Sequence, residues 1–329
     1  MICLRIILLL LYAISNAIAH DITLPYNFGV PFHVSMNIPN IYRPPQATKS
    51  KRWQRATELY NQYIVQDLSI PDKPRIPTII HQIWLGSPLP NECKVLQQTW
   101  LTCHPDWLYL FWTDTLPQSF GDKNIQIISP QSFSDVVTFL DNLNPKKGTY
   151  IIDIRNLTFS TAPHFKARKN YGEKSDILRY EILFYCGGLY IDTDFECLQP
   201  FDVFHYACDF YIGAAHSIDL FSVHNSLIAA RPRHPIVNAC ICAIQLQSPT
   251  QNSYTGEAVM ARTGPYQLTN HVWAHMSNCQ DRTVVFPMTY FHPWIHTARA
   301  ENTREQIEKW IKPESYGIHH WHVSWLPKS

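Results

Sequence analysis

Short hydrophobic runs alternate with amphipathic stretches along most of this chain. Runs rich in β-branched and aromatic residues predict strands, at 78–85, 107–112, 125–128, 150–154, 189–191, 211–214 and 222–230. Stretches with apolar residues three or four positions apart predict helices, at 91–103, 134–143, 175–186, 235–247 and 264–276. Strands that alternate with helices indicate an open α/β sheet with mostly parallel strands. Such a sheet binds its ligands beyond the carboxyl ends of the strands.

The first 75 residues depart from this pattern. Arg5 precedes an apolar run, and Ala17-Ile18-Ala19 has the small-x-small pattern of a cleavage site. The apolar run covers about 14 residues whereas a membrane span needs ~20, so we predict a cleaved signal peptide at 1–19. The alternative is an uncleaved single-pass anchor, the one route by which we expect the chain to meet a membrane. Residues 20–75 are predicted to form a stem or wrapping arm, helix-like from 49 to 67, before the main domain at 76–329.

Composition narrows the class of protein. Of the 329 residues, 46% are hydrophobic and only 16% are charged, so the chain is globular and able to bury a large core. The net charge of +1 gives no basic surface for a polyanion, and we therefore exclude nucleic acid as a partner. Eight of the nine cysteines remain after loss of a signal peptide, and Cys93 and Cys103 are close enough in sequence for a local disulfide. The cysteine spacing gives no support for a zinc site.

Two aspartates follow the predicted strand at 189–191. Gly187 and Gly188 end the preceding helix, and the strand then runs into Asp192-Thr193-Asp194. Side chains two residues apart on an extended segment point the same way, so the two carboxylates converge and repel unless a cation lies between them. Oxygen ligands of this kind suit Mg²⁺ or Mn²⁺. The alternative for an Asp-x-Asp sequence taken alone is a solvated turn.

A charged pair lies on the preceding helix. Asp176 and Arg179 are spaced i, i+3 and therefore share a helix face. One interpretation is a surface ion pair. The other is that Asp176 accepts hydrogen bonds from sugar hydroxyls while Arg179 contacts phosphate or the sugar.

Several blocks in a fixed order resemble glycosyltransferase family 32. This family comprises Asp-x-Asp sugar transferases that include α-1,6-mannosyltransferases and α-1,4-galactosyltransferases. The chain is more distantly similar to the catalytic domain of the large glucosylating toxins. The matching blocks lie at 76–86, 104–107, 111–114, 175–200, 225–235, 263–265 and 319–325.

The resemblance implies a GT-A fold, a Rossmann-like, mostly parallel central sheet flanked by helices, with 76–329 as the catalytic domain. In this fold Trp84 would stack on the nucleobase, and the alternative is a core tryptophan. His81 and Gln82 would line the same nucleotide site, and a role in strand packing is the alternative for both. Asp176 and Arg179 match the Asp-x-x-Arg pair that holds the donor sugar.

The resemblance also implies a metal site and its neighbours. Asp192 and Asp194 match the family's metal motif, and His319 in the closing segment would complete the metal site, although the adjacent His320 leaves the choice open. The alternative for this histidine-rich segment is a surface tail. Two further residues, Ser324 and Trp325, would lie near the diphosphate. Asn225 would lie near the reacting sugar carbon, with a strand-turn role as its alternative.

Together these features predict a retaining, metal-dependent hexosyltransferase that uses Mn²⁺ or Mg²⁺, with Asp192, Asp194, Arg179 and Asn225 at the reaction. The donor is expected to be a UDP- or GDP-hexose, and the acceptor a glycan, a glycolipid or a protein. The location is expected to be a Golgi-like secretory lumen or the outside of the cell. One alternative is an inactive glycan- or nucleotide-binding protein of the same fold. A metal-dependent hydrolase would need more carboxylate or histidine ligands close to Asp192.

Overall fold

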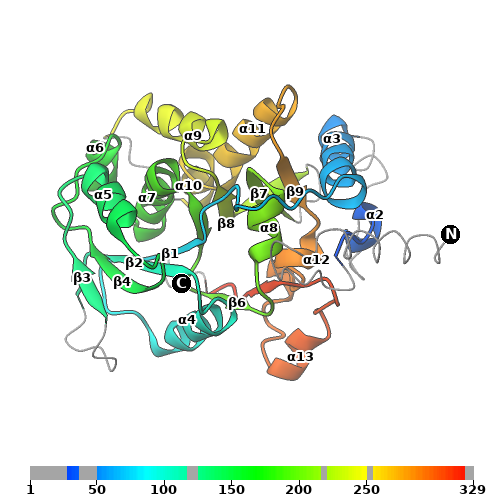
Figure 1. Cartoon of the computed structure of the whole chain (residues 1–329), viewed down its shortest axis with the longest axis horizontal. Coiled ribbons are helices and arrows are strands. Elements are labelled where there is room, and N and C mark those ends of the chain that lie inside the picture. Colours follow the sequence, from blue (N-terminus) through cyan, green and yellow to red (C-terminus); the bar gives the residue numbers. More distant parts are fainter. Residues whose placement is uncertain (1–27, 37–49, 117–124, 216–220, 250–254, 323–329) are drawn as a thin grey trace.

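The computed structural model describes residues 28–36, 50–116, 125–215, 221–249 and 255–322 (Figure 1). The predicted signal peptide at 1–19 lies outside the described residues, and so do Ser324 and Trp325.

An eight-stranded sheet forms the centre of the molecule, with the strand order β3-β4-β2-β1-β5-β8-β7-β9 (Figure 1). Its strands are β1 (Ile79–Trp84), β2 (Leu108–Thr113), β3 (Gln126–Ile128), β4 (Gly148–Asp153), β5 (Gly188–Ile191), β7 (Phe210–Ala215), β8 (Ser222–Ala230) and β9 (Thr283–Phe286). Strand β8 runs antiparallel to both of its neighbours, and the other neighbouring pairs are parallel. Two short strands, β6 (Phe195–Cys197) and β10 (Gly317–His319), pair antiparallel in a separate ribbon.

Helices flank this sheet, with α5, α7 and α9 above it and α4 below it in Figure 1. The helices are α2 (Phe32–Ser35), α3 (Lys51–Tyr60) continued by η2 (Asn61–Gln66), α4 (Asn91–Cys103), α5 (Phe133–Asn142), α6 (Ala162–Ala167), α7 (Tyr171–Cys186), α8 (Asp202–Ala207), α9 (Pro235–Gln245), α10 (Gly256–Arg262), α11 (Pro265–Met276), α12 (Met288–Phe291), η3 (His296–Ala298) and α13 (Arg304–Glu308). The predicted fold class, an α/β protein with a mostly parallel central sheet flanked by helices, is confirmed.

The turn between α7 and β5 requires glycine. Both Gly187 and Gly188 have positive φ, and a Cβ on Gly188 would lie 2.6 Å from the carbonyl oxygen of Ile79. This close approach places β5 directly beside β1, with Leu189 opposite Ile80. Strand β5 therefore lies in the middle of the sheet, and its last residue is followed at once by Asp192.

The described part of the predicted arm packs into the same hydrophobic core as the sheet. Phe32, Trp53 and Tyr60 are buried in that core, and the hydroxyl groups of Tyr60 and Tyr290 are hydrogen-bonded at 2.8 Å. Helix α3 contacts β9, the last strand in the sheet order. The arm thus covers one end of the sheet, while the domain division at residue 75 stays a prediction.

The predicted start of the helix at Ser175 is wrong. Helix α7 begins at Tyr171, and the side chain of Asn170 caps it by accepting a hydrogen bond from the N–H of Glu173 at 3.0 Å. Asn170 is as good a capping residue as serine, and Ser175 lies inside the helix. Its hydroxyl contacts Arg179 and Tyr190.

A disulfide between Cys93 and Cys103 is also excluded by the fold. Both residues lie on helix α4, at its third and last positions. Ten residues of α-helix rise about 15 Å, whereas bridged cysteines have Cα atoms less than ~7 Å apart.

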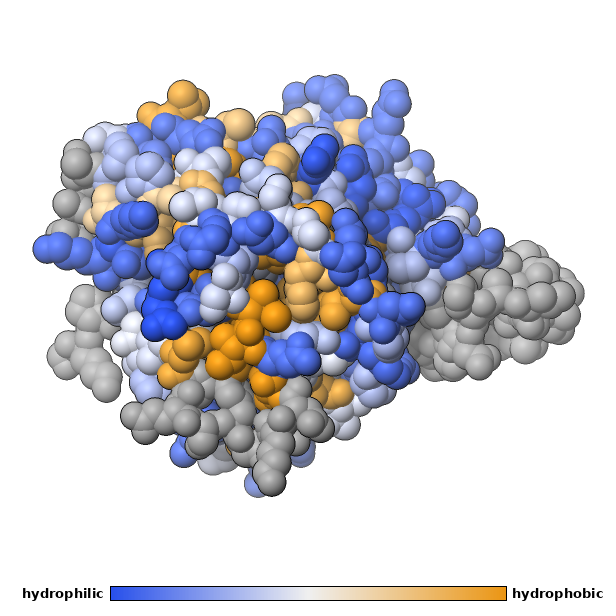
Figure 2. Space-filling model, turned by 60° about the vertical axis from the view of Figure 1, so that its left-hand side comes forward, coloured by the Kyte–Doolittle hydropathy of each residue, from blue (hydrophilic) through white to orange (hydrophobic). Residues whose placement is uncertain are grey.

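The described surface is mixed in character. Hydrophilic residues cover much of the face in Figure 2, with a group of hydrophobic residues near its centre. Among the helices of the described residues, none is both long and apolar enough to cross a bilayer.

We expect the stability of the fold to fall between pH 7 and pH 5. Burial lowers the pKa of His81 and His104 to about 4 and the pKa of His205 to about 3. An unfolded histidine titrates near 6.5, so below this pH the unfolded chain binds protons that the folded chain excludes. Each of these three histidines should therefore lower the free energy of unfolding by about 2 kcal/mol at pH 5. Urea unfolding at pH 7, 6 and 5 measures this loss.

The variant His205→Gln is the control for this pH dependence. It cannot titrate, so its unfolding free energy should change less with pH than that of the parent chain. An unfolding free energy of the parent that stays constant from pH 7 to pH 5 would contradict the expectation.

Candidate functional site

The Asp192-Thr193-Asp194 segment lies at the carboxyl end of β5, which neighbours β1 near the middle of the sheet. Backbone hydrogen bonds hold this turn. The N–H of Asp192 donates to the carbonyl of Ser226 at 2.8 Å, and the N–H of Phe195 donates to the carbonyl of Asp192 at 3.2 Å. The aspartates thus lie at the edge of the sheet where parallel α/β proteins bind ligands.

Asp192, Asp194 and His319 form a compact group that we call the Asp–Asp–His cluster. One ligand atom from each residue lies within 4.8 Å of the other two. Nε2 of His319 lies 3.1 Å from Oδ1 of Asp194 and 3.9 Å from Oδ2 of Asp192. His319 is buried, and the side chains of Asp194 and Asp192 are 13% and 28% exposed, so the cluster is reached from its Asp192 side. Two carboxylates and one imidazole fit a divalent cation such as Mn²⁺, and three protein ligands leave coordination positions for other oxygens.

The two neighbouring histidines near the end of the described chain face different partners. Successive side chains of a strand point to opposite faces, and β10 ends at His319. His319 faces Asp194, whereas Nε2 of His320 lies 3.0 Å from Oε2 of Glu196. Of the two, His319 is the one that belongs to the cluster.

The Asp–Asp–His cluster attracts positive charge. Burial alone would raise the pKa of Asp194, but the charge and the hydrogen bond of His319 hold it well below its usual range. Burial would lower the pKa of His319, and the charge of Asp194 raises it instead. Burial raises the pKa of Asp192, and Arg179 opposes this rise. A histidine binds a metal through a neutral ring nitrogen, so binding of a cation by these three residues would require Nε2 of His319 to be unprotonated.

Asp176 lies next to the cluster and is hydrogen-bonded on both oxygens. Oδ1 accepts from Nδ2 of Asn225 at 2.8 Å, and Oδ2 accepts from the hydroxyl of Thr263 at 3.0 Å. Arg179 adds an ion pair at 3.0 Å. Burial raises the pKa of Asp176 to about 6 against the opposing charge of Arg179. The predicted pair on α7 is therefore internal, which excludes the surface ion pair.

The guanidinium of Arg179 is fully engaged by the protein. Nη1 donates to the carbonyl of Asn225 at 2.5 Å and lies 3.5 Å from Oδ1 of Asp192. Nη2 and Nε contact the hydroxyl and the carbonyl of Ser175. The ring of Tyr190 stacks against the guanidinium, with Cζ 4.3 Å from the ring centroid. Arg179 thus links Asp176 to Asp192, and a direct contact with a ligand would require one of these bonds to exchange.

The three predicted residues of β1 differ in their surroundings. His81 is fully buried, with Nε2 2.8 Å from the carbonyl of Gly187 and Nδ1 accepting from Nε1 of Trp112 at 3.2 Å. These bonds favour the strand-packing alternative for His81. Gln82 is also fully buried and donates to the carbonyl of Asp192 at 3.2 Å, so it supports the backbone of the cluster. Trp84 is half-buried at the carboxyl end of β1, with its indole N–H donating to the hydroxyl of Ser87.

One contributor was missed in the sequence. The hydroxyl of Tyr190 donates to Oδ1 of Asp192 at 2.7 Å, and its ring supports Arg179. The signal was present, because Tyr190 precedes Asp192 by two residues on an extended segment and therefore points the same way. Asn225, by contrast, was among the predicted site residues, and it lies on β8. Its side chain donates to Asp176, and its carbonyl accepts from Arg179.

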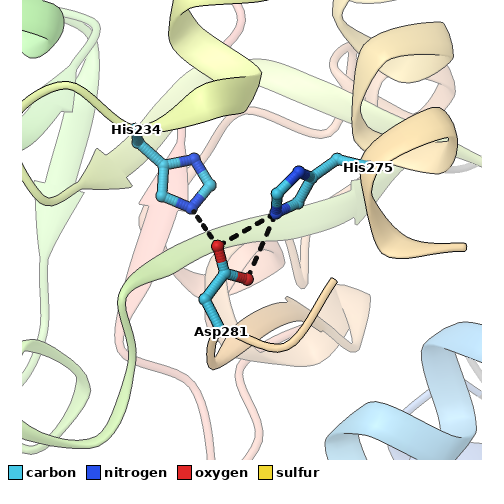
Figure 3. A group of neighbouring side chains, drawn as sticks. All are labelled: His234, His275 and Asp281. Carbon is cyan, nitrogen blue, oxygen red and sulfur yellow. Dashed lines mark hydrogen bonds and ion pairs between the residues drawn. The ribbon is translucent and has the colours of Figure 1, made fainter. Parts of the chain in front are cut away.

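A second group of potential ligands lies outside this site, at His234, His275 and Asp281 (Figure 3). Nε2 of His234 lies 3.2 Å from Oδ2 of Asp281, and Nε2 of His275 lies 3.0 Å from the same oxygen. Nδ1 of His234 accepts from the N–H of Ile236 at 3.3 Å, which assigns the ring proton to Nε2. A metal at Nε2 would need the opposite tautomer. Through Asp281 the group therefore links the residue that caps α9, helix α11 and the turn before β9.

The family comparison matches the part of the chain that holds the aspartates. Residues 90–210 match the model of the glycosyltransferase sugar-binding region containing the DXD motif. This range includes Asp176, Arg179, Asp192 and Asp194, and leaves Asn225 and His319 outside it.

Two curated relatives are, by name, a mannosyltransferase and a mannosyl phosphorylinositol ceramide synthase. Inositol phosphoceramide mannosyltransferase 2 of Schizosaccharomyces pombe is 27% identical, over 61% of this chain and 47% of its own length. A mannosyl phosphorylinositol ceramide synthase of Saccharomyces cerevisiae is 26% identical, over 74% of this chain and 49% of its own. Among solved structures, the catalytic domain of alpha-toxin from Clostridium novyi has a TM-score of 0.45 at 12% identity, covering 86% of this chain and 87% of that one.

The chain spans about half the length of these two curated relatives. The resemblance inferred from the sequence is confirmed, because residues 90–210 match the glycosyltransferase sugar-binding region containing the DXD motif and the curated relatives include mannosyltransferases.

Proposed function

We propose that this protein is a metal-dependent, retaining hexosyltransferase that moves a sugar from a nucleoside diphosphate to an acceptor hydroxyl. The observation that carries the proposal is the Asp–Asp–His cluster at the carboxyl end of β5, with the buried charges of Arg179 and Asp176 beside it. A protein that only bound glycans would not need two converging carboxylates together with an arginine that holds one of them in place.

In this proposal Asp192, Asp194 and His319 hold the divalent cation. When bound, the cation supplies Lewis-acid charge that offsets the negative charge developing on the leaving diphosphate. Arg179 is a positioning residue, since its bonds to Asn225 and Asp192 fix the carboxylate before the ligand arrives. Tyr190 acts in the same way through its hydroxyl group.

The remaining residues are assigned to the donor. Trp84 is half-buried at the carboxyl end of β1, where we assign its indole face to the nucleobase. Asp176 is buried and is bonded to Asn225, and we assign the two residues to the sugar hydroxyls and the region of the anomeric carbon. Ser324 and Trp325 stay assigned to the diphosphate by resemblance alone.

We propose a same-face displacement for the reaction itself. The bond between the anomeric carbon and the acceptor oxygen forms as the bond to the diphosphate oxygen breaks, and the acceptor proton passes to that leaving oxygen. The α configuration is then retained without a protein nucleophile. The protein contributes orientation and a site shielded from bulk water.

The names of the fungal relatives indicate which substrates to test first. Several are mannosyltransferases or synthases that act on inositol phosphoceramide. We therefore propose GDP-mannose as the first donor and a hydroxyl of an inositol-containing sphingolipid as the first acceptor. Other UDP- and GDP-hexoses, and glycan or protein acceptors, complete the panel. We place the reaction in the secretory lumen or outside the cell, in line with the predicted signal peptide.

The variant Asp194→Asn should lose metal binding and activity together. The amide keeps the shape of the side chain but removes the charge that attracts the cation. In the parent chain, Mn²⁺ with GDP or UDP should raise the melting temperature by a few degrees. The variant should show no such shift, and its rate of donor hydrolysis or transfer should fall by at least about 100-fold.

Two neighbouring histidines provide the matched control for this test. His319→Ala should behave like Asp194→Asn, whereas His320→Ala should keep the Mn²⁺-dependent shift because His320 faces Glu196. Asp281→Asn should keep it as well. A full Mn²⁺ response in Asp194→Asn, or its loss in Asp281→Asn alone, would overturn the metal assignment.

The variant Tyr190→Phe tests the support of Asp192. It removes the hydroxyl that donates to Asp192 but keeps the ring under Arg179. The expected results are an increase of about 10-fold in the dissociation constant for Mn²⁺ and a loss of about 1 kcal/mol in unfolding free energy. Calorimetric titration with Mn²⁺ measures the first quantity. Tyr185→Phe is the control, and equal affinities in the two variants would contradict a role for the Tyr190 hydroxyl.

The stereochemistry of the first product tests the displacement. With an α-linked nucleotide sugar as donor, proton NMR of the product formed before any mutarotation should show an α linkage. A β linkage would refute retention while leaving the metal assignment intact.

A further inference from the structure

Two free thiols meet behind the Asp192–Asp194 turn. Cys103 is the last residue of α4, and Cys197 is the last residue of β6. The N–H of Cys197 donates to the hydroxyl of Thr99 at 2.9 Å. Thr99 and Cys103 are spaced i, i+4 and share a helix face, so this bond brings Cys197 to the face that carries Cys103. The side chains of Cys103 and Cys197 interact, and Sγ of Cys197 also donates to the carbonyl of Gln199 at 3.3 Å.

Their surroundings give the two thiols different reactivity. Cys197 is buried, and Cys103 is half-buried and open to small reagents. The contact with Cys197 lowers the pKa of Cys103 to about 7, while burial raises the pKa of Cys197. Near neutral pH, Cys103 is therefore substantially ionised, and the thiolate is the form that attacks a disulfide.

The strand β6 connects this pair to the Asp–Asp–His cluster. It begins one residue after Asp194, and it pairs with β10 so that Phe195 lies opposite His319. Helix α4 also holds β6, because the indole N–H of Trp100 donates to the carbonyl of Phe195 at 2.7 Å. A covalent bond between α4 and β6 would hold β6 in place. This strand directly follows Asp194 and pairs with the strand that carries His319.

We propose that Cys103 and Cys197 form a disulfide that clamps α4 to β6 behind the metal-binding turn. The oxidant is a low-molecular-weight disulfide such as oxidised glutathione. The Cys103 thiolate attacks it, forming a mixed disulfide and releasing one glutathione thiolate. Cys197 then loses its proton to solvent and attacks the sulfur of Cys103, which releases the second glutathione. The two protein thiols are oxidised, and one glutathione disulfide is reduced to two thiols. Secretory compartments supply such oxidants.

The test uses the full chain, first reduced with a phosphine and then incubated with oxidised glutathione at about pH 7.5. Alkylation and peptide mass spectrometry should identify a cross-linked pair of peptides that contain Cys103 and Cys197. Since the bond closes a loop of roughly 90 residues, the oxidised chain should melt roughly 5 °C higher than the reduced chain. These readouts do not depend on transferase activity, so they succeed or fail independently of the proposed function.

Three variants complete the design. Cys103→Ser alters a half-buried residue and should fold, and it should lose both the cross-link and the oxidation-dependent rise in melting temperature. Cys197→Ala should lose them too. Cys242→Ser changes an exposed cysteine on α9 and should keep both. The proposal is overturned if Cys103 retains glutathione without passing to Cys197, if the cross-link joins other cysteines, or if Cys103→Ser melts as the oxidised parent does.

Discussion

Several carboxylates lie close together after β5, and most of the other interactions in the site compensate their negative charge. Asp176, Asp192 and Asp194 lie within one small region of limited exposure, where unpaired carboxylates would be costly. Arg179 compensates the first two from helix α7, and His319 compensates the third from the far end of the described chain. The pairing of β10 with β6 brings the imidazole of His319 to the turn. The site therefore combines charges that lie far apart in the sequence, on backbone positions fixed by the sheet and by the β6–β10 ribbon.

Much of this arrangement could be predicted from local signals. The alternation of apolar runs predicted seven of the eight strands of the large sheet, all except β9, together with helices α4, α5, α7, α9 and α11. The spacing of Asp192 and Asp194 placed them together on one side of an extended segment. The start of α7 was missed because Asn170 and Ser175 are similarly good capping residues. The sequence alone does not show which of the two caps the helix. The strands β6 and β10 were missed because each has three residues, and their pairing joins positions that are about 120 residues apart.

The partners of buried polar side chains were the least predictable part. His81 carries the same imidazole as His319, yet its two nitrogens are taken up by Gly187 and Trp112 inside the sheet. The group at His234, His275 and Asp281 contains metal-type ligands, but the backbone N–H of Ile236 sets the tautomer of His234 against metal binding. In both cases a neighbouring backbone group or indole determines whether the histidine is available to a metal or ligand. The spacing of residues along the sequence does not reveal these neighbours.

The packing of α3 against β9 has a consequence for how the molecule can be shortened. Strand β9 ends the sheet order, and an uncovered edge strand presents unpaired backbone groups that can dock with another chain. The blocks that resemble the transferase family begin only at residue 76, so a fragment trimmed to that boundary would lack α3. Such a fragment would retain every residue assigned to the reaction in the described structure and yet be prone to edge-to-edge association in solution.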